Sequence, residues 1–121
     1  MTKLLRLLLV LGLVVPGILA HAQPIGIIPQ PVSTQWQSGS FSLDANTVIV
    51  ATPAEKQTVA FFSDYLQRFY GLKLHVVASA PASNYIQFQT SPSATPREGR
   101  YTLKATSTAI TITGDTDPGT F

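Results

Sequence analysis

One stretch of the chain, residues 52–71, carries the pattern of an amphipathic helix. Thr52 can cap the first free amides, Pro53 suits the first helical position, and Glu55 completes a capping box. Gly71 is expected to end the helix in a left-handed conformation. The apolar positions between these two ends recur at steps of three and four residues, which places them on one face of the helix: Val59, Phe62, Leu66 and Phe69.

Five shorter stretches carry the pattern of β-strands, in which β-branched and apolar residues alternate with polar ones. The clearest pairs of same-face residues are Ile86 with Phe88 and Ile110 with Ile112. Leu72, Leu74 and Val76 are expected to share the buried face of another strand. The predicted strands lie within residues 41–51, 72–77, 85–89, 100–105 and 109–113.

The order of these elements predicts the fold class. A strand, the helix and a strand come first, which favours a crossover between parallel strands. Thr106-Ser107-Thr108 separates the last two strands and predicts an antiparallel hairpin. We therefore expect an α+β (or α/β) fold, with a mixed sheet of about five strands and one amphipathic helix on one face.

The predicted helix is too narrow to cover the predicted sheet. Five strands at roughly 4.8 Å spacing make a sheet about 24 Å wide, whereas one helix covers a strip of about 10–12 Å. About half of one sheet face stays uncovered. The chain stops in a loop at Gly119-Thr120-Phe121. We expect a second helix or another domain to follow, so that residues 23–121 form a domain truncated at its C-terminal end.

The first 22 residues have the three parts of a cleavable secretion signal. Lys3 and Arg6 supply the positive start, residues 7–19 form an apolar run, and Ala20-His21-Ala22 offers a cleavage site. The apolar run is shorter than the roughly 20 residues that span a bilayer. We predict export to the periplasm or the extracellular medium, with no membrane attachment after cleavage.

Removal of the signal changes the charge balance. The full chain has 8 basic and 6 acidic residues, and Lys3 and Arg6 leave with the signal, so 6 of each sign remain. A neutral chain without a basic cluster argues against nucleic-acid binding. Cysteine is absent, which excludes disulfides and thiolate metal sites. Removing 22 of 121 residues leaves 99, enough for one small domain.

The mature sequence offers no catalytic, cofactor-binding or metal-binding residue that we would assign. His75 is its single histidine and is expected to be a partly exposed structural residue on a strand. Asp115-Thr116-Asp117 has loosely the spacing of a calcium loop but favours a turn. Arg97, Glu98 and Arg100 are interpreted as a solvated strand entry. Trp36 is expected to act as a hydrophobic plug rather than a sugar-stacking platform.

Several short motifs occur in an order that resembles the N-terminal domain of bacterial β-N-acetylhexosaminidases of glycoside hydrolase family 20. The resemblance covers the mature chain from about residue 24 to its end, and it is carried by Ile27-Ile28-Pro29-Gln30-Pro31, Gly39-Ser40-Phe41-Ser42-Leu43, Glu98-Gly99-Arg100-Tyr101-Thr102-Leu103, Ile110-Thr111-Ile112 and Gly119-Thr120-Phe121.

The resemblance implies that a catalytic (β/α)8 barrel follows this domain and that a second helix packs on the same sheet face. In the family, an Asp-Glu pair in the barrel and the 2-acetamido group of the substrate perform the hydrolysis, an exception to the two-carboxylate scheme. That pair has no counterpart in residues 1–121. The resemblance thus implies an accessory domain, inactive by itself, that meets its glycan substrate only through the barrel.

Two other functions fit the same sequence. Similar sheet domains precede the barrels of other glycosidases such as α-glucuronidases. A free-standing secreted module could instead bind sugars or another partner through exposed aromatic residues such as Trp36, Tyr65 or Tyr85. If the chain is such a module, we expect a soluble monomer. If it is a truncated domain, we expect an exposed apolar surface.

Overall fold

The computed structural model describes residues 26, 30–116 and 120, in two compact units that are considered separately. The first unit, Met1–Trp36, forms no helix or strand in its described part. The predicted secretion signal and the Ile27-Ile28-Pro29 part of the first motif lie outside the described residues. The second unit, Gln37–Phe121, carries the sheet and the helix.

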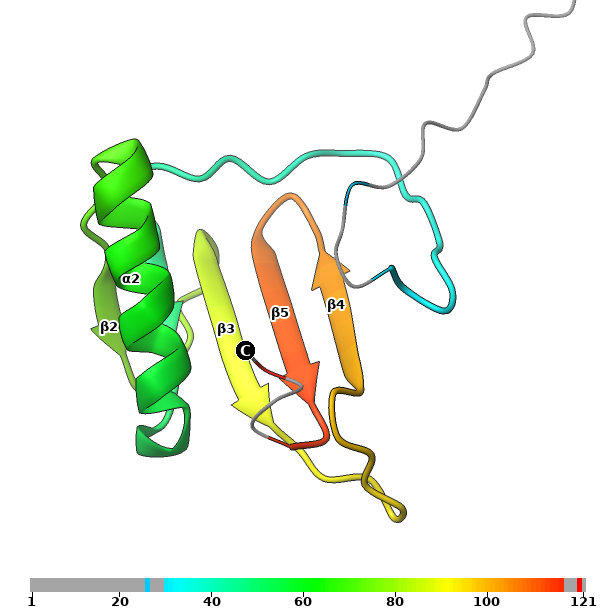
Figure 1. Ribbon diagram of the computed structural model, residues 1–121. Coiled ribbons are helices and arrows are strands. Elements are labelled where there is room, and N and C mark those ends of the chain that lie inside the picture. Colours follow the sequence, from blue (N-terminus) through cyan, green and yellow to red (C-terminus); the bar gives the residue numbers. More distant parts are fainter. Residues whose placement is uncertain (1–25, 27–29, 117–119, 121) are drawn as a thin grey trace, which may run out of the picture. The chain divides into compact units, whose positions relative to one another are not determined.

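The sheet has five strands in the order β2-β1-β3-β5-β4 (Figure 1). β1 pairs in parallel with both β2 and β3, β3 pairs in parallel with β5, and β4 runs antiparallel to β5 at one edge. The predicted mixed sheet, the parallel first pair and the final hairpin are therefore confirmed. The strands are β1 (Val48–Val50), β2 (His75–Val77), β3 (Tyr85–Thr90), β4 (Tyr101–Ala105) and β5 (Ala109–Gly114).

The helix begins and ends where its sequence predicts. Thr52 and Glu55 form a capping box around a 3-10 turn, η2 (Pro53–Glu55), which leads into α2 (Lys56–Tyr70). Gly71 follows with φ 68°, a left-handed conformation, and its amide reaches back to the last helical carbonyls. Proline at the first position removes an amide that would be unpaired there, while the Thr52 oxygen and the Gly71 amide pair backbone groups at the two ends.

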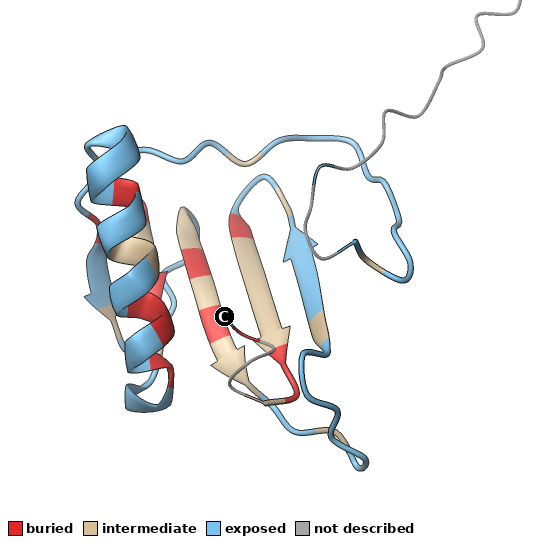
Figure 2. Ribbon diagram, viewed as in Figure 1, coloured by how far each residue is buried: buried red, intermediate tan, exposed pale blue. Residues whose placement is uncertain are grey.

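The core lies between α2 and the strands that the helix covers (Figure 2). Phe62 on α2 meets Phe88 on β3 edge-on, with ring centroids 5.3 Å apart. Partly buried residues, Ile110 and Ile112 among them, extend this cluster toward β5. The buried residues of the cluster are Ile49, Val59, Leu66, Leu74, Ile86 and Phe88.

Two residues that the periodicity assigned to the core are exposed. Phe69 is 66% exposed, because its ring packs against Tyr65 on the helix surface rather than against the sheet. Val76 is 53% exposed. It lies on β2, which is the edge strand of the sheet, and borders an open recess beside the helix.

The first strand is shorter than the sequence predicts. A turn at Asp44–Thr47 separates Phe41 from β1, with the Thr47 amide donating to the Asp44 carbonyl at 3.1 Å. The Asp44 carboxylate also accepts a hydrogen bond from the Asn46 amide at 2.8 Å. Phe41 nevertheless packs against the core, although it is not part of a strand.

The sheet face on the helix side is only partly covered, as the width comparison predicts. The helix α2 lies over the β2–β1–β3 side of the sheet (Figure 1). Leu103 on β4, opposite Ile112 on β5, is 45% exposed. Leu103 is therefore an accessible apolar side chain on the part of this face that α2 does not cover.

Candidate functional site

A buried carboxylate joins the helix to the sheet. Glu55 is only 4% exposed, and it accepts hydrogen bonds from the Thr52 amide at 2.9 Å, the Thr52 hydroxyl at 2.6 Å and the Thr90 amide at 2.9 Å. Burial raises the pKa of this carboxyl, but the three donors together outweigh burial and lower it below its usual 4.5. A carboxylate held ionised by protein donors is an anchor rather than a proton donor.

A second carboxylate, Asp115, closes the loop that precedes β4. It is 8% exposed and accepts hydrogen bonds from the Ser93 hydroxyl at 3.0 Å and the Arg97 amide at 3.3 Å. The Arg100 guanidinium lies 3.3 Å from the same carboxylate. Burial raises the pKa of Asp115, but these partners together lower it by more, so that the pKa lies below its usual 3.8. Its Oδ2 atom already has three protein partners, and Asp117 of the predicted turn lies outside the described residues.

Arg97, Glu98 and Arg100 are exposed directly before β4, as expected of a solvated strand entry, and two of them also contact Asp115. The Arg97 amide and the Arg100 side chain both contact Asp115, a carboxylate with a side-chain exposure of 10%. No local sequence pattern predicts this contact, because Asp115 follows β5 and reaches Arg100 only when β4 and β5 pair. The Arg97 amide and the Arg100 side chain therefore help to hold the loop before β4 against the end of β5.

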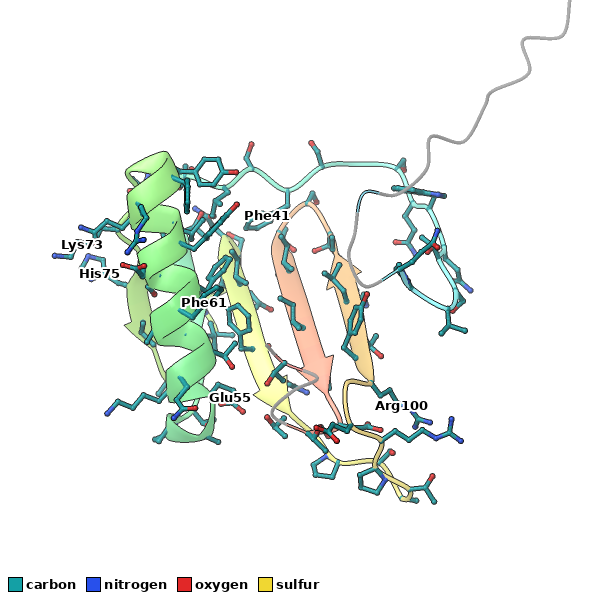
Figure 3. The ribbon with its side chains drawn as sticks, viewed as in Figure 1. Phe41, Glu55, Phe61, Lys73, His75 and Arg100 are labelled. Carbon is teal, nitrogen blue, oxygen red and sulfur yellow. The ribbon has the colours of Figure 1, made fainter. Side chains whose placement is uncertain are left out.

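The single histidine of the described chain is not part of a site. His75 lies on the edge strand β2 and is exposed, and Figure 3 shows it beside Lys73 at the outer edge of the sheet. Within the described ranges, no three His, Cys, Asp or Glu side chains are grouped closely enough to hold a metal ion. A search of the same residues finds no helix that is long and apolar enough to cross a membrane.

A recess of about 560 Å³ opens between the first turns of α2 and the edge strand β2. Val59, Ser63 and Val76 are among its lining residues, and Lys56 is the charged residue that borders it. The lining contains no carboxylate and no histidine. The recess therefore lacks the acid and base groups that hydrolysis of a glycosidic bond requires.

Aromatic side chains gather on the surface of α2. The ring centroid of Tyr65 lies 4.9 Å from that of Phe69 and 6.0 Å from that of Tyr70. A hydrogen bond with Tyr70, followed by the nearby Tyr70 charge and burial, raises the pKa of Tyr65 above 10.0. Phe61 lies one turn earlier, on the side of α2 nearer to β3 (Figure 3). We call Phe61, Tyr65, Phe69 and Tyr70 the aromatic patch; their exposures are 60%, 41%, 66% and 64%.

The other two aromatic candidates lie elsewhere. Trp36 belongs to the first unit and is 70% exposed, which contradicts its prediction as a buried plug. Tyr85 opens β3 and is half-buried. It alternates with the core residue Ile86, so its side chain lies on the sheet face opposite α2. Tyr65 and Tyr85 are therefore on different faces and do not form one sugar-binding surface.

Residues 24–121 match the family described as glycosyl hydrolase family 20, domain 2. The fold is similar to two crystal structures of a GH20 exo-β-N-acetylglucosaminidase from Vibrio harveyi, one in complex with N-acetylglucosamine and one of an inactive mutant. Each has 28% sequence identity, a TM-score of 0.65 and coverage of 87% of this chain. The chain spans only 15% of the length of either structure. No curated protein matches the chain.

Proposed function

We propose, from the premise that this chain belongs to glycosyl hydrolase family 20 as its domain 2, that it is the N-terminal accessory domain of an exported β-N-acetylhexosaminidase. The parent enzyme would remove terminal N-acetylhexosamine from glycans or chito-oligosaccharides. The domain would contribute structure, and a catalytic barrel outside these 121 residues would contribute the chemistry.

The observation that carries the proposal is the extent of the two matches. The family match covers residues 24–121, whereas the chain corresponds to 15% of the Vibrio harveyi enzyme. The two buried carboxylates agree with a structural role, since Glu55 and Asp115 both bind protein donors and their pKa values are lowered. A general acid of a glycosidase needs the opposite shift, a raised pKa.

Export is supported by the sequence of residues 1–22, with its basic start, apolar run and Ala20-His21-Ala22 cleavage site. We place the parent enzyme in the periplasm or the extracellular medium on this basis. The family membership favours a hexosaminidase over the α-glucuronidase alternative.

The test is to purify the complete gene product from the native host and compare it with the 121-residue chain. Release of 4-nitrophenol from 4-nitrophenyl N-acetyl-β-D-glucosaminide reports activity, and the mass of the N-terminal peptide reports cleavage after Ala22. We expect hydrolysis by the complete product and none by the 121-residue chain. A native product that ends at Phe121 and binds chito-oligosaccharides would establish the free-standing module instead.

A further inference from the structure

We propose that the open edge of the sheet at β2 binds an extended acidic segment of another polypeptide, which adds a strand to the sheet and places one apolar side chain in the recess beside α2. This inference goes beyond the proposed function, since hydrolysis of a glycan does not require it. Its test does not depend on the outcome of the activity assay.

The β2 strand directs backbone groups toward the open side of the sheet. Among the described strands β2 is the last one on this side, and it pairs with β1 through residues 75–77. The Ala51 amide donates to the Val77 carbonyl at 3.2 Å, so the Val77 carbonyl points toward β1. Successive backbone groups of a strand point in opposite directions, and the amide and carbonyl of Val76 therefore point away from β1. Such an edge is a template on which an extended segment forms a further strand.

The recess next to this edge fits an apolar side chain of the added strand. Val76 pairs with the core residue Ile49, so both side chains lie on the α2 side of the sheet. Val76 is 53% exposed and lines the recess of about 560 Å³. A residue opposite Val76 on an added strand would point its side chain to the same side. There it would meet Val59 and Ala60 of α2, which also line the recess.

The charges around the edge favour an acidic segment. Lys56 borders the recess, and Lys73 lies at the outer edge of the sheet directly before β2 (Figure 3). Both lysines are exposed. Residues 71–84, which include β2, contain no Asp or Glu. The acidic residue of α2, Asp64, is already paired with Arg68 at 3.1 Å. Carboxylates at the two ends of an added strand would therefore complement a basic rim.

The same charges disfavour a second copy of the chain as the occupant. Two β2 edges that paired with each other would bring the basic side chains of both copies together, with no acidic residue in residues 71–84 to compensate. Like charges on paired strands are destabilising, and a lysine on an edge strand is a common protection against self-association. An acidic segment instead removes this repulsion.

Binding of a short peptide to the complete gene product tests the proposal. The probe is acetyl-Glu-Thr-Ile-Thr-Glu-amide with a fluorescent label, and fluorescence anisotropy measures its binding. We expect saturable binding that is at least tenfold tighter than the binding of acetyl-Lys-Thr-Ile-Thr-Lys-amide. Lys56→Glu with Lys73→Glu should reverse this preference. Lys104→Glu, at an exposed position of the opposite edge strand β4, is the control and should change the affinity by less than twofold.

Two further changes distinguish strand addition from charge attraction alone. Val76→Pro removes the amide that points to the open edge and leaves the bond from Ala51 to Val77 in place. N-methyl groups on the three inner residues of the probe remove its amide donors without any change in the protein. Each change should weaken binding at least tenfold. The midpoint of urea unfolding shows whether the Val76→Pro variant keeps its fold, and the methylated probe gives the answer if it does not.

Three outcomes would overturn the proposal. The first is the absence of saturable binding, or equal binding of the acidic and basic probes. The second is binding that survives methylation of the probe, which would identify an electrostatic contact without an added strand. The third is self-association in sedimentation velocity that Val76→Pro abolishes, which would identify a second copy as the occupant.

Discussion

The Glu55 carboxylate accepts a hydrogen bond from the Thr90 amide at 2.9 Å and so joins the first turn of the helix to the last residue of β3. The same side chain completes the capping box with Thr52. One buried residue therefore caps the first turn of the helix and binds it to the end of β3. Carboxylates are catalytic groups in many enzymes, but in this domain the Glu55 carboxylate has a structural role.

Replacing Glu55 should destabilise the domain. Glu55→Ala removes the acceptor of three hydrogen bonds, two of them from backbone amides. Hydrogen bonds to charged groups contribute about 1.5–3 kcal/mol each, and caps about 1 kcal/mol. We expect a loss of about 4–5 kcal/mol in the free energy of unfolding, near the lower end of that sum, measured by urea denaturation. Glu98→Ala, at an exposed position, is the control and should change it by less than about 0.5 kcal/mol.

Acid should weaken the fold through the two buried carboxylates. Both pKa values lie below their usual 4.5 and 3.8 in the folded state, so the unfolded state binds protons first as the pH falls. Their stabilisation is complete above about pH 5 and disappears as the pH falls through the lowered values. Thermal denaturation between pH 7 and pH 2.5 measures this loss.

The double variant Glu55→Gln, Asp115→Asn identifies the groups responsible for the acid sensitivity. It should be less stable than the wild type at pH 7 and should lose less stability between pH 5 and pH 3. Asp64→Asn removes a carboxylate that is 66% exposed and is the control for the loss of a negative surface charge. An unchanged slope in the double variant would mean that other groups cause the acid sensitivity.

The helix end depends on the left-handed conformation of Gly71. At φ 68°, a side chain with a Cβ atom is strained even though the surrounding space is open. Gly71→Ala should therefore cost about 1 kcal/mol. Gly71→Asn should cost less, because asparagine tolerates this conformation. The midpoint of urea unfolding distinguishes the two variants, and an equal loss in both would point to a cause other than the backbone conformation.

Leu66 and Phe69 lie three residues apart on α2 but should differ strongly in their effect on stability. Leu66 is 3% exposed, and Leu66→Ala should cost about 2–5 kcal/mol by leaving a cavity in the core. Phe69 is 66% exposed, and Phe69→Ser should cost less than about 1 kcal/mol. Similar losses in both variants would show that Phe69 belongs to the core of the domain.

The family and the boundaries of the helix could be predicted because they depend on residues close together in the sequence. A capping box, a left-handed glycine and a hairpin turn each involve neighbouring residues. Thr52, Glu55 and Gly71 therefore lie where the sequence places them. Alternation of residue type also identified Ile86 and Phe88 as core residues, since successive side chains of a strand point to opposite faces.

The remaining features depend on how distant segments pack. Periodicity placed Phe69 on the core stripe, but packing against Tyr65 instead of the sheet left its ring exposed. Periodicity likewise placed Val76 in the core, but the position of β2 at the sheet edge exposed it. The bond from Thr90 to Glu55 spans 35 positions, and Asp115 meets Arg100 only after β4 pairs with β5. Short-range patterns constrain local backbone conformation, whereas contacts of this range arise only when the whole sheet has assembled.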